Sequence, residues 1–313
     1  MIRYTLRRVL GMVPILIGTT LIIFLTVWAL PGDPLQSLAG PTTPLSPSVR
    51  AVLIERYNLD EPLLTQYWLY VTDLVTGDLG TDLEGKEVSE KVGRAWPVTL
   101  KLGLSAWLVA GVIGITLGSF AGIRPGGKID LFVLSLTTLI LGIPFFVIAF
   151  VLQYLVGVEL GWLPTSGVRE GWPINYIMPA FVLGMFAVPE VARLTRAAVI
   201  DNRTADYVDT AKARGIPHRR IVVRHILRNS LVPIVSLMGL VLGNLLGGAV
   251  LIEAIFNIPG IGFEVFRAIR VQNGPVVIGV STMLVLVYLV VNLVVDLLYG
   301  LLDPRISLER KGA

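Results

Sequence analysis

Side chains that could serve as nucleophiles, general bases or metal ligands are scarce in this sequence. It contains no cysteine, which excludes disulfides, thiolate metal sites and cysteine nucleophiles. Its two histidines, His218 and His225, lie in one basic segment instead of an apolar one. The phosphate-binding pattern G-x-x-x-x-G-K-[ST] is missing as well, so the sequence predicts no nucleotide site of that kind and no catalytic residues.

Polar side chains inside the long apolar stretches are equally few. Gln153, Asn244 and Asn292 lie within them, while Glu253 and Asp296 lie at their ends, where we expect hydration to cost little. A proton-coupled secondary transporter would need an acid or a histidine relay near the middle of the membrane. An intramembrane enzyme would need a nucleophile and a base at matching depth. Neither arrangement is evident, so both classes are disfavoured.

The composition is that of a membrane protein. Of the 313 residues, 54% are apolar and 15% are charged, against about 25% charged residues in soluble domains. About 20 apolar residues are needed to cross a bilayer, and stretches of that length predict an all-α polytopic protein with about six transmembrane helices. The predicted spans are residues 9–30, 102–122, 131–156, 171–189, 231–252 and 275–295. The first lacks a cleavage pattern and is expected to be retained.

The positions of Lys and Arg predict the orientation. They concentrate at the N-terminus, between the second and third spans, in segment 190–230 and at the C-terminus, which places both termini in the cytoplasm. The expected organisation is a tail with the first span (1–30), an outer loop (31–97), a transmembrane core (98–303) and a cytoplasmic tail (304–313). Within the outer loop, helices are expected from Pro47 to about Leu59 and over 63–75.

Two sets of glycines recur every four residues, which places each set on one helix face and permits close approach of another helix. The sets are Gly114, Gly118 and Gly122 in the second span, and Gly239, Gly243 and Gly247 in the fifth. They are explained either by ordinary helix packing or by a contact that shifts between conformations. In the third span, Gly142-Ile143-Pro144 predicts a kink.

Segment 190–230 reads as a helix, a break and a second helix. Residues 201–214 have helical composition, and Gly215 suits the position after a helix, where the backbone turns left-handed. Pro217 can begin the next helix, expected over 218–229, which has one apolar side and several arginines. A basic hairpin resting on anionic lipid would read the same way.

Four stretches together resemble one family, the permease subunits of bacterial ABC importers, and within it the first permease of the dipeptide/oligopeptide/nickel branch. The cytoplasmic EAA-type signature is matched by Asp209-Thr210-Ala211-Lys212-Ala213-Arg214-Gly215 and closed by Leu231-Val232-Pro233. The other matching stretches are Tyr4 to Arg8 with Pro31-Gly32-Asp33-Pro34, Glu253-Ala254-Ile255-Phe256 with Ile258 to Gly262, and residues 291–299 with Leu302-Asp303-Pro304-Arg305.

The resemblance implies a type I ABC importer permease fold in the bacterial inner membrane and a translocation pathway for dipeptides or oligopeptides. It implies four kinds of partner, namely a second homologous permease, two ATP-binding subunits, an extracytoplasmic peptide-binding protein and the lipid bilayer, and no nucleic acid. No cofactor is expected in this chain, because ATP and Mg would be bound by the ATPase subunits. An exporter, or a nickel or glutathione member of the family, remains open.

The resemblance also assigns residues. Coupling to the ATPase subunits is expected at Asp206, Tyr207, Asp209, Ala211, Gly215, Arg219, Arg220 and Pro233. Tyr207 and the small Ala211 are expected to share the docking surface. The outer gate and binding-protein contact are expected at Phe256, Pro259, Gly260 and Gly262. Helix packing is expected at Gly114, Gly118, Gly239 and Gly243.

Overall fold

The computed structural model describes residues 2–28, 46–82, 85–271 and 273–302. In these ranges the regular elements are helices, and the β pairing is limited to an isolated antiparallel bridge between Thr81 and Glu87. The prediction of an all-α fold is therefore confirmed. The turn cluster 31–34 and the tail 304–313 lie outside the described residues. The chain divides into two units, Met1–Thr99 with Pro259–Ala313 and Leu100–Ile258, called unit 1 and unit 2 below.

The number of apolar helices agrees with the prediction of about six spans. Five helices in the described part of the chain are long and apolar enough to cross a membrane, and a bent pair makes six if it counts as one span. The five spans are α1 (Ile2–Trp28), α5 (Val88–Ile123), α8 (Ile174–Arg203), α11 (Arg228–Phe256) with the turns before it, and α13 (Gly274–Leu302).

The third span is broken at the predicted kink, and the bend is sharper than a kink within one helix. Helix α6 (Lys128–Gly142) is followed, after a bend of 95°, by α7 (Phe145–Leu152). Helix α7 continues as the π-helical segment η1 (Gln153–Glu159). At the bend Ile143 has φ −103° and ψ 123°, and Pro144 has φ −57° and ψ 133°. Proline lacks an N–H and disfavours helical geometry in the residue before it, and here Ile143 is extended, so the predicted kink is a break.

Other helices run past their predicted ends. Helix α5 begins at Val88, inside the expected outer loop, and α8 continues from Ile174 through Pro179 and Pro189 to Arg203. Such prolines are tolerated in membrane helices because neighbouring groups satisfy the freed carbonyls. The helical segment predicted over 201–214 is interrupted, because Thr204 and Ala205 separate the end of α8 from α9 (Asp206–Ala213).

The helix predicted over 218–229 is longer than expected. It begins as α10 (His218–Arg220), continues through the π-helical segment η2 (Ile221–Leu227) and runs on as α11 to Phe256. Pro233, which closes the family signature, therefore lies inside α11, and its expected role in coupling stays a prediction.

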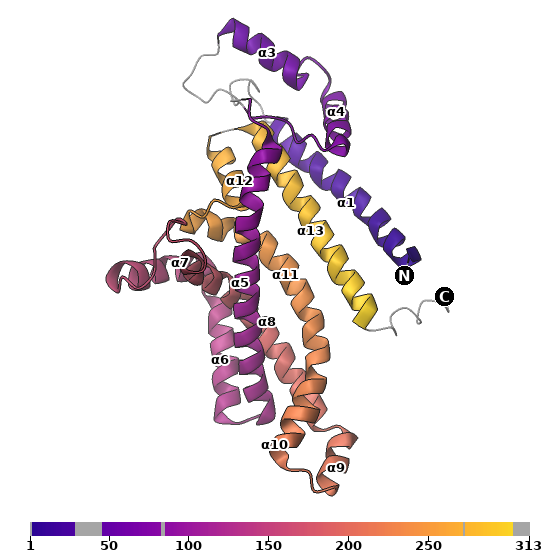
Figure 1. The fold of residues 1–313 in the computed structure, drawn as a ribbon, viewed down its shortest axis with the longest axis vertical. Coiled ribbons are helices and arrows are strands. Elements are labelled where there is room, and N and C mark those ends of the chain that lie inside the picture. The colour runs from indigo at the N-terminus through magenta and orange to yellow at the C-terminus, as the bar shows by residue number, and fades with distance from the viewer. Residues whose placement is uncertain (1, 29–45, 83–84, 272, 303–313) are drawn as a thin grey trace. The chain divides into compact units, whose positions relative to one another are not determined.

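In unit 2, the first glycine set lies against α8 (Figure 1). A Cβ added at Gly114 would lie 2.7 Å from the Cβ of Val191, and one at Gly122 would lie 2.7 Å from the Cβ of Val199. A Cβ at Gly118 would overlap the carbonyl oxygen of Ala192. This set therefore packs two helices closely, as predicted.

The second glycine set gives a different result. A Cβ added at Gly247 would meet nothing within 4 Å, although Gly243 is buried in α11 and Gly239 is half-buried. The spacing alone therefore does not mean that every member of a set touches another helix. Whether either set forms a contact that shifts between conformations stays a prediction.

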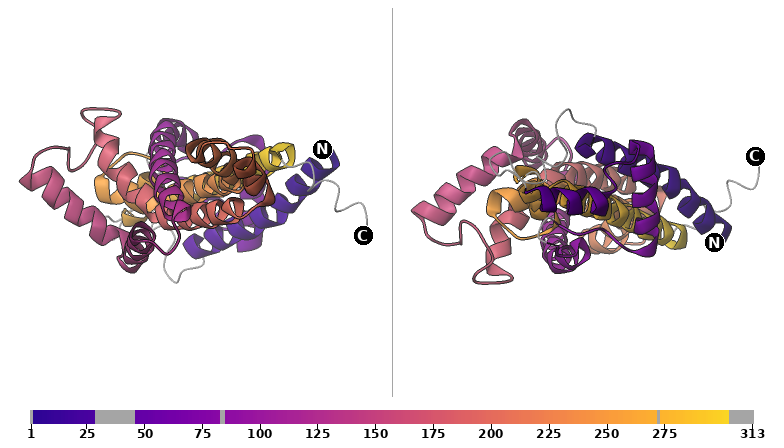
Figure 2. Two further views of the ribbon diagram at one scale, coloured as in Figure 1. Left: turned by 90° about the horizontal axis from the view of Figure 1, so that it is seen from below. Right: turned by 90° about the horizontal axis from the view of Figure 1, so that it is seen from above.

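In unit 1, α1 and α13 lie side by side (Figure 2), and α4 (Leu63–Thr76) contacts α1. The Tyr67 hydroxyl of α4 lies 2.9 Å from the Thr20 hydroxyl, and its ring meets Phe24 edge-on at 5.6 Å between centroids. Helix α3 (Pro47–Tyr57) precedes α4, which confirms both helices expected in the outer loop. Helix α12 (Ile261–Arg270) packs on α13.

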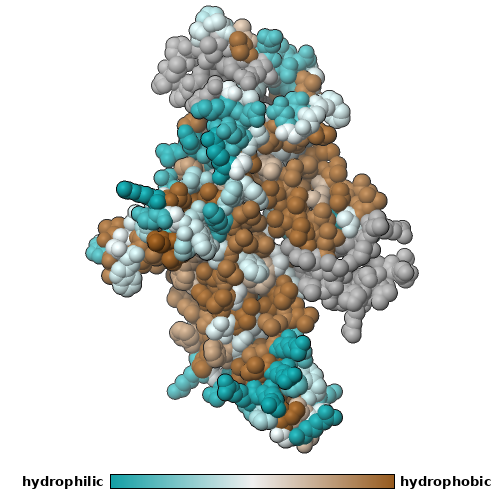
Figure 3. Space-filling view, in the orientation of Figure 1, coloured by the Kyte–Doolittle hydropathy of each residue, from teal (hydrophilic) through white to brown (hydrophobic). Residues whose placement is uncertain are grey.

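The surface of each unit separates apolar from polar side chains. Hydrophobic side chains cover the visible faces of α1 and α13, and hydrophilic ones gather where α9 and α10 lie (Figure 3). Only 11% of the most apolar window of α1 is buried within the chain. An exposed helix of that composition is suited to lipid, because lipid tails solvate aliphatic side chains without cost.

Candidate functional site

Helix α9 has a buried face and an exposed face. Val208 is 1% exposed and Ala211 is 6% exposed, and both pack against Val199 of α8 and against Ile221 and Ile226 of η2. The expectation that Ala211 contributes to an exposed docking surface is therefore wrong, because its small side chain lets α9 pack on its own chain. The exposed face of α9 consists of Asp206, Tyr207, Asp209, Thr210, Lys212 and Ala213.

The charges of α9 follow its dipole. Asp206 and Asp209 lie in the first turn and Lys212 lies in the last, so each faces the helix end of opposite partial charge. Lys212 Nζ donates to Asp209 Oδ1 at 2.8 Å. Both side chains are largely exposed, so we expect this ion pair to add little stability. A partner could therefore recruit either charge at small cost.

The turn after α9 matches the prediction for Gly215. This residue has φ +71°, a left-handed conformation that costs any residue with a Cβ more than glycine. The N–H of Gly215 donates to Lys212 O at 2.9 Å, and the N–H of Ile216 donates to Ala211 O at 3.2 Å. Ile216 packs on the cluster that contains Ala211, which completes a Schellman-type helix end.

The chain leaves this turn through Pro217, whose carbonyl accepts the N–H of Arg220 at 2.8 Å and that of Ile221 at 3.1 Å. Pro217 thus begins the next helix, as predicted. Arg219 and Arg220 follow it and are both exposed. The two arginines therefore lie on the same hydrophilic end of unit 2 as the exposed face of α9 (Figure 3).

Hydrogen bonds tie α9 and α11 to the end of α8. The Tyr207 hydroxyl donates to Asn202 Oδ1 at 2.6 Å, and Asn202 Nδ2 donates to Ala198 O at 2.9 Å. On the other side, the buried Ser230 hydroxyl donates to Ala198 O at 3.1 Å. Both connections meet at Ala198, so α8 is the element that positions the whole segment.

Unit 2 buries two acidic side chains whose burial was not predicted from the sequence. Glu253 is fully buried, which corrects the expectation that it is hydrated at a span end. Asp130, in the first turn of α6, is 2% exposed and pairs with Arg196 of α8. The signal available in the sequence was a lone acid at the start of an apolar run, and such ionisable groups are functional suspects by default.

The residues predicted for the outer gate are divided between the two units and are mostly buried. In unit 2, Phe256 is 1% exposed, its carbonyl accepts the N–H of Gly167 at 2.8 Å, and Asn257 ends α11 in a left-handed conformation. In unit 1, Pro259 is half-buried, and Gly260 and Gly262 are buried at the start of α12.

Helix α12 is anchored in unit 1 by one polar bond and one apolar row. The N–H of Ile261 donates to the Thr99 hydroxyl at 2.9 Å, and Ile261 and Ala268 pack with Val276 and Val280 of α13. Its exposed side chains are Phe266, Arg267, Ile269 and Arg270. These side chains are accessible from outside the chain and the glycines are buried, whereas the role of α12 in an outer gate or binding-protein contact stays a prediction.

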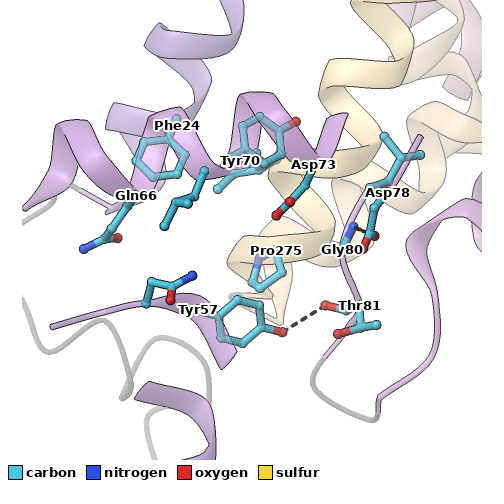
Figure 4. A pocket seen from close by; sticks show the side chains of 13 residues that line it. Phe24, Tyr57, Gln66, Tyr70, Asp73, Asp78, Gly80, Thr81 and Pro275 are labelled. Carbon is cyan, nitrogen blue, oxygen red and sulfur yellow. Dashed lines mark hydrogen bonds between the residues drawn. The ribbon is translucent and has the colours of Figure 1, made fainter. Parts of the chain in front are cut away.

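Unit 1 also contains a cavity of ≈ 240 Å³ between α4, the loop after it and the start of α13 (Figure 4). The Tyr57 hydroxyl donates to Thr81 O at 2.9 Å across its rim, and Asp73, Asp78 and Pro275 line it. Among the described residues, no group of three or more His, Asp or Glu side chains gathers as a metal site would.

Two protein families account for nearly the whole chain. Residues 114–308 match "Binding-protein-dependent transport system inner membrane component", and residues 1–100 match "Binding-prot-dependent transport system membrane comp, N-term". The chain belongs to the family of binding-protein-dependent transport system inner membrane components. The resemblance found in the sequence is thereby confirmed.

Relatives of this membrane component match it from end to end. The glutathione transport system permease protein GsiC of Escherichia coli K12 is 35% identical over 309 residues, 98% of this chain and 99% of that protein. GsiC of Salmonella typhimurium LT2 is 34% identical over 307 residues, with the same shares covered. The membrane component is thus the permease subunit of an ABC importer and a multi-pass inner-membrane protein, and an importer of this kind works with ATPase subunits and a binding protein.

Solved structures share the fold of this membrane component. The MetNI methionine ABC transporter, in inward-facing conformations, matches with a TM-score of 0.57 and 20% identity, covering 68% of this chain and 96% of that one. An amino acid ABC transporter with histidines matches with a TM-score of 0.52 and 16% identity, covering 67% and 93%. The predicted ABC importer permease fold is therefore confirmed.

Proposed function

We propose that this permease subunit imports a small peptide of the glutathione class, together with a second homologous permease. The observation that carries this proposal is the match to GsiC proteins, which are 34–35% identical and are covered over 99% of their length. Glutathione is itself a modified tripeptide, so this cargo lies within the short peptides expected from the sequence. The lack of cysteine and of histidine clusters argues against a nickel pathway.

The exposed face of α9, with Arg219 and Arg220 beside it, is the proposed docking surface for an ATPase subunit. Support comes from its position at the polar end of unit 2, from its attachment to α8 and from its match to the coupling signature. The ATPase chemistry, with its Mg and ATP, is assigned to that partner, because the chain has no G-x-x-x-x-G-K-[ST] sequence.

The proposed orientation places both termini and α9 in the cytoplasm, supported by the distribution of Lys and Arg. The chain has no native cysteine, so a single introduced one reports its own side of the membrane. A cysteine at the exposed Ser48 should react with an impermeant thiol reagent in intact cells, and one at the exposed Thr204 should not. Reaction at position 204 and protection at position 48 would show that the orientation is the reverse of the one proposed.

The substrate is tested by reconstituting the chain in proteoliposomes with its second permease, its ATPase subunits and its binding protein. We expect ATP-dependent uptake of labelled glutathione, competed by short peptides and not by Ni²⁺. Omitting the ATPase subunits is the control and should abolish uptake. Uptake of ordinary dipeptides without glutathione would refute the proposed class, and ATP-driven efflux would refute import.

A further inference from the structure

The ion pair between α6 and α8 has a directional geometry. Arg196 Nε donates to Asp130 Oδ1 at 2.5 Å, and Arg196 Nη2 donates to Asp130 Oδ2 at 2.8 Å. The same Oδ2 accepts the N–H of Gly126, in the turn between α5 and α6, at 2.8 Å. A bidentate guanidinium–carboxylate pair fixes angle as well as distance. The pair therefore sets the position of α6 and of the α5–α6 turn relative to α8.

A third helix segment meets the pair at the same level. A Cβ added at Gly122 of α5 would lie 2.9 Å from the carbonyl oxygen of Arg196, so the α5 backbone runs directly against this turn of α8. The segments of α5, α6 and α8 in unit 2 therefore converge at Arg196. Glycine packing alone sets how close two helices come, whereas the ion pair also resists sliding and rotation.

The burial of the pair argues that it serves position more than stability. The Asp130 side chain is 3% exposed and that of Arg196 is 26% exposed. Desolvating two charges costs about as much as their attraction returns, and an apolar pair of similar volume often holds helices as well. The ion pair therefore adds little stability beyond what a pair of leucines would give. What it adds is a single defined geometry between the two helices.

The pair is connected to the proposed docking helix through α8. From Arg196, α8 continues through Val199, which packs on Val208 and Ala211 of α9, and reaches Asn202, which accepts the hydroxyl of Tyr207. The Ser230 hydroxyl ties α11 to Ala198 in the same stretch. A displacement of α9 therefore reaches α8 within two turns of the ion pair.

We propose that Asp130 and Arg196 are positioning residues for energy coupling, locking α6 to α8 so that both move with α9 as one body. The inference rests on the proposed coupling role of α9 and adds the route by which movement spreads from it. Neither residue touches the proposed docking face, and neither belongs to the signature that identifies the coupling segment.

The first test measures ATP hydrolysed per glutathione imported by the reconstituted importer. Asp130→Asn keeps shape and an acceptor oxygen but removes the charge, and we expect it to raise the ratio between about twofold and about thirtyfold, the usual range when a link between two sites is weakened. Arg196→Lys keeps the charge but loses the bidentate fork and should give an intermediate ratio. If both residues act through one pair, the double variant should give the same ratio as Asp130→Asn alone.

A matched control lies one turn away. Arg193 also joins α8 to α6, because its Nη2 donates to the Thr138 hydroxyl at 3.1 Å. This contact is exposed, and its acceptor is an uncharged hydroxyl. Arg193→Gln should leave the ratio of ATP to substrate unchanged. A rise as large as that of Asp130→Asn would mean that any α6–α8 contact suffices, which overturns the specific role of the ion pair.

The deciding measurement of the second test leaves the ion pair intact. Spin labels on cysteines at Phe132 of α6 and Val223 of η2, the segment on which α9 packs, report the distance between these elements in the otherwise cysteine-free chain; both sites are exposed. We expect the same distance with and without trapped ATP in the wild-type importer, and a broadened distribution in Arg196→Lys. A wild-type distance that changes with ATP overturns the one-body proposal, even if Asp130→Asn fails to assemble.

The outcomes separate this inference from the proposed function. If the wild-type complex imports no glutathione, the substrate proposal fails, and the spin-label distance still decides whether α6 and η2 move together. If the wild type imports glutathione and the Asp130 and Arg196 variants show its normal ratio of ATP to substrate, the function stands and the ion pair has no coupling role.

Discussion

The close packing of α5 on α8 predicts a measurable difference between two glycine-to-alanine changes on the same helix. Gly118→Ala places a methyl group against the carbonyl oxygen of Ala192 and 2.6 Å from the Cβ of Thr195, so the backbones must separate. Gly93→Ala on α5 is the matched control, because its Cβ meets nothing within 4 Å and the site is exposed.

The control removes helix propensity from the comparison. Replacing glycine by alanine inside a helix gains about 1 kcal/mol at either site. Only Gly118→Ala adds the cost of overpacking, about 1–3 kcal/mol. The two variants should therefore differ by about 1–3 kcal/mol in the free energy of unfolding. At about 2–4 °C per kcal/mol, their melting temperatures should differ by about 2–12 °C, with Gly118→Ala the lower.

The assay is thermal unfolding of the purified chain in detergent, followed by loss of the monodisperse chromatographic peak. Gly114→Ala gives an internal gradient, because its Cβ would lie 2.7 Å from the Cβ of Val191 and 3.3 Å from the nearest backbone oxygen, a milder overlap than the one with the Ala192 oxygen at Gly118. We expect the melting temperature to be highest for Gly93→Ala, lower for Gly114→Ala and lowest for Gly118→Ala. Equal melting temperatures for the Gly93 and Gly118 variants would show that α5 and α8 are not packed as described.

Three further changes test unit 1 and the coupling segment, each by its effect on thermal stability. Ala211→Arg should lower the melting temperature sharply because Ala211 is 6% exposed, whereas Ala213→Arg on the exposed face should leave it unchanged; equal effects would contradict the two faces of α9. Gly215→Ala should cost about 1–2 kcal/mol from its φ of +71° alone, since its Cβ meets nothing within 4 Å, and a neutral result would mean that the turn is not left-handed. Burial raises the pKa of Tyr70 to about 12 from its usual 10.0, so its contribution to stability is complete below pH 10.0 and is lost as the pH rises toward 12. Tyr70→Phe, which also removes the 2.6 Å bond to Thr282, should reduce the loss of melting temperature over that interval, and an unchanged loss would contradict it.

The features that were predictable from the sequence are those set by local rules. Span number follows from the length of apolar stretches, because a bilayer has a fixed thickness. The left-handed turn at Gly215 follows from a glycine placed between two helical patterns and before Pro217. The close contact of Gly114 and Gly118 follows from their spacing, since helical periodicity puts them on one face.

The features that were not predictable depend on contacts distant in sequence. Pro144 lies at the break between α6 and α7, whereas Pro179 and Pro189 lie inside α8, although proline has the same local effect at all three positions. Glu253 looked hydrated because it lies at the end of an apolar run, yet unit 2 buries it completely. Asp130 lies one residue before its predicted span, so its burial against Arg196 could only be seen once α8 was in place.

In the segment proposed for coupling, two residues of the family signature build the scaffold and not the exposed face. Ala211 and Gly215 both serve the chain itself, one by packing on Val199 and the other by reversing the backbone. The side chains left for a partner, among them Tyr207 and Thr210, are placed by that internal packing. Ala211 and Gly215 of the signature therefore specify the scaffold that holds the outer face, the surface proposed above for the ATPase subunit. Substitutions on the outer face should then alter partner preference at constant stability, whereas substitutions at Ala211 should lower stability whichever ATPase is present.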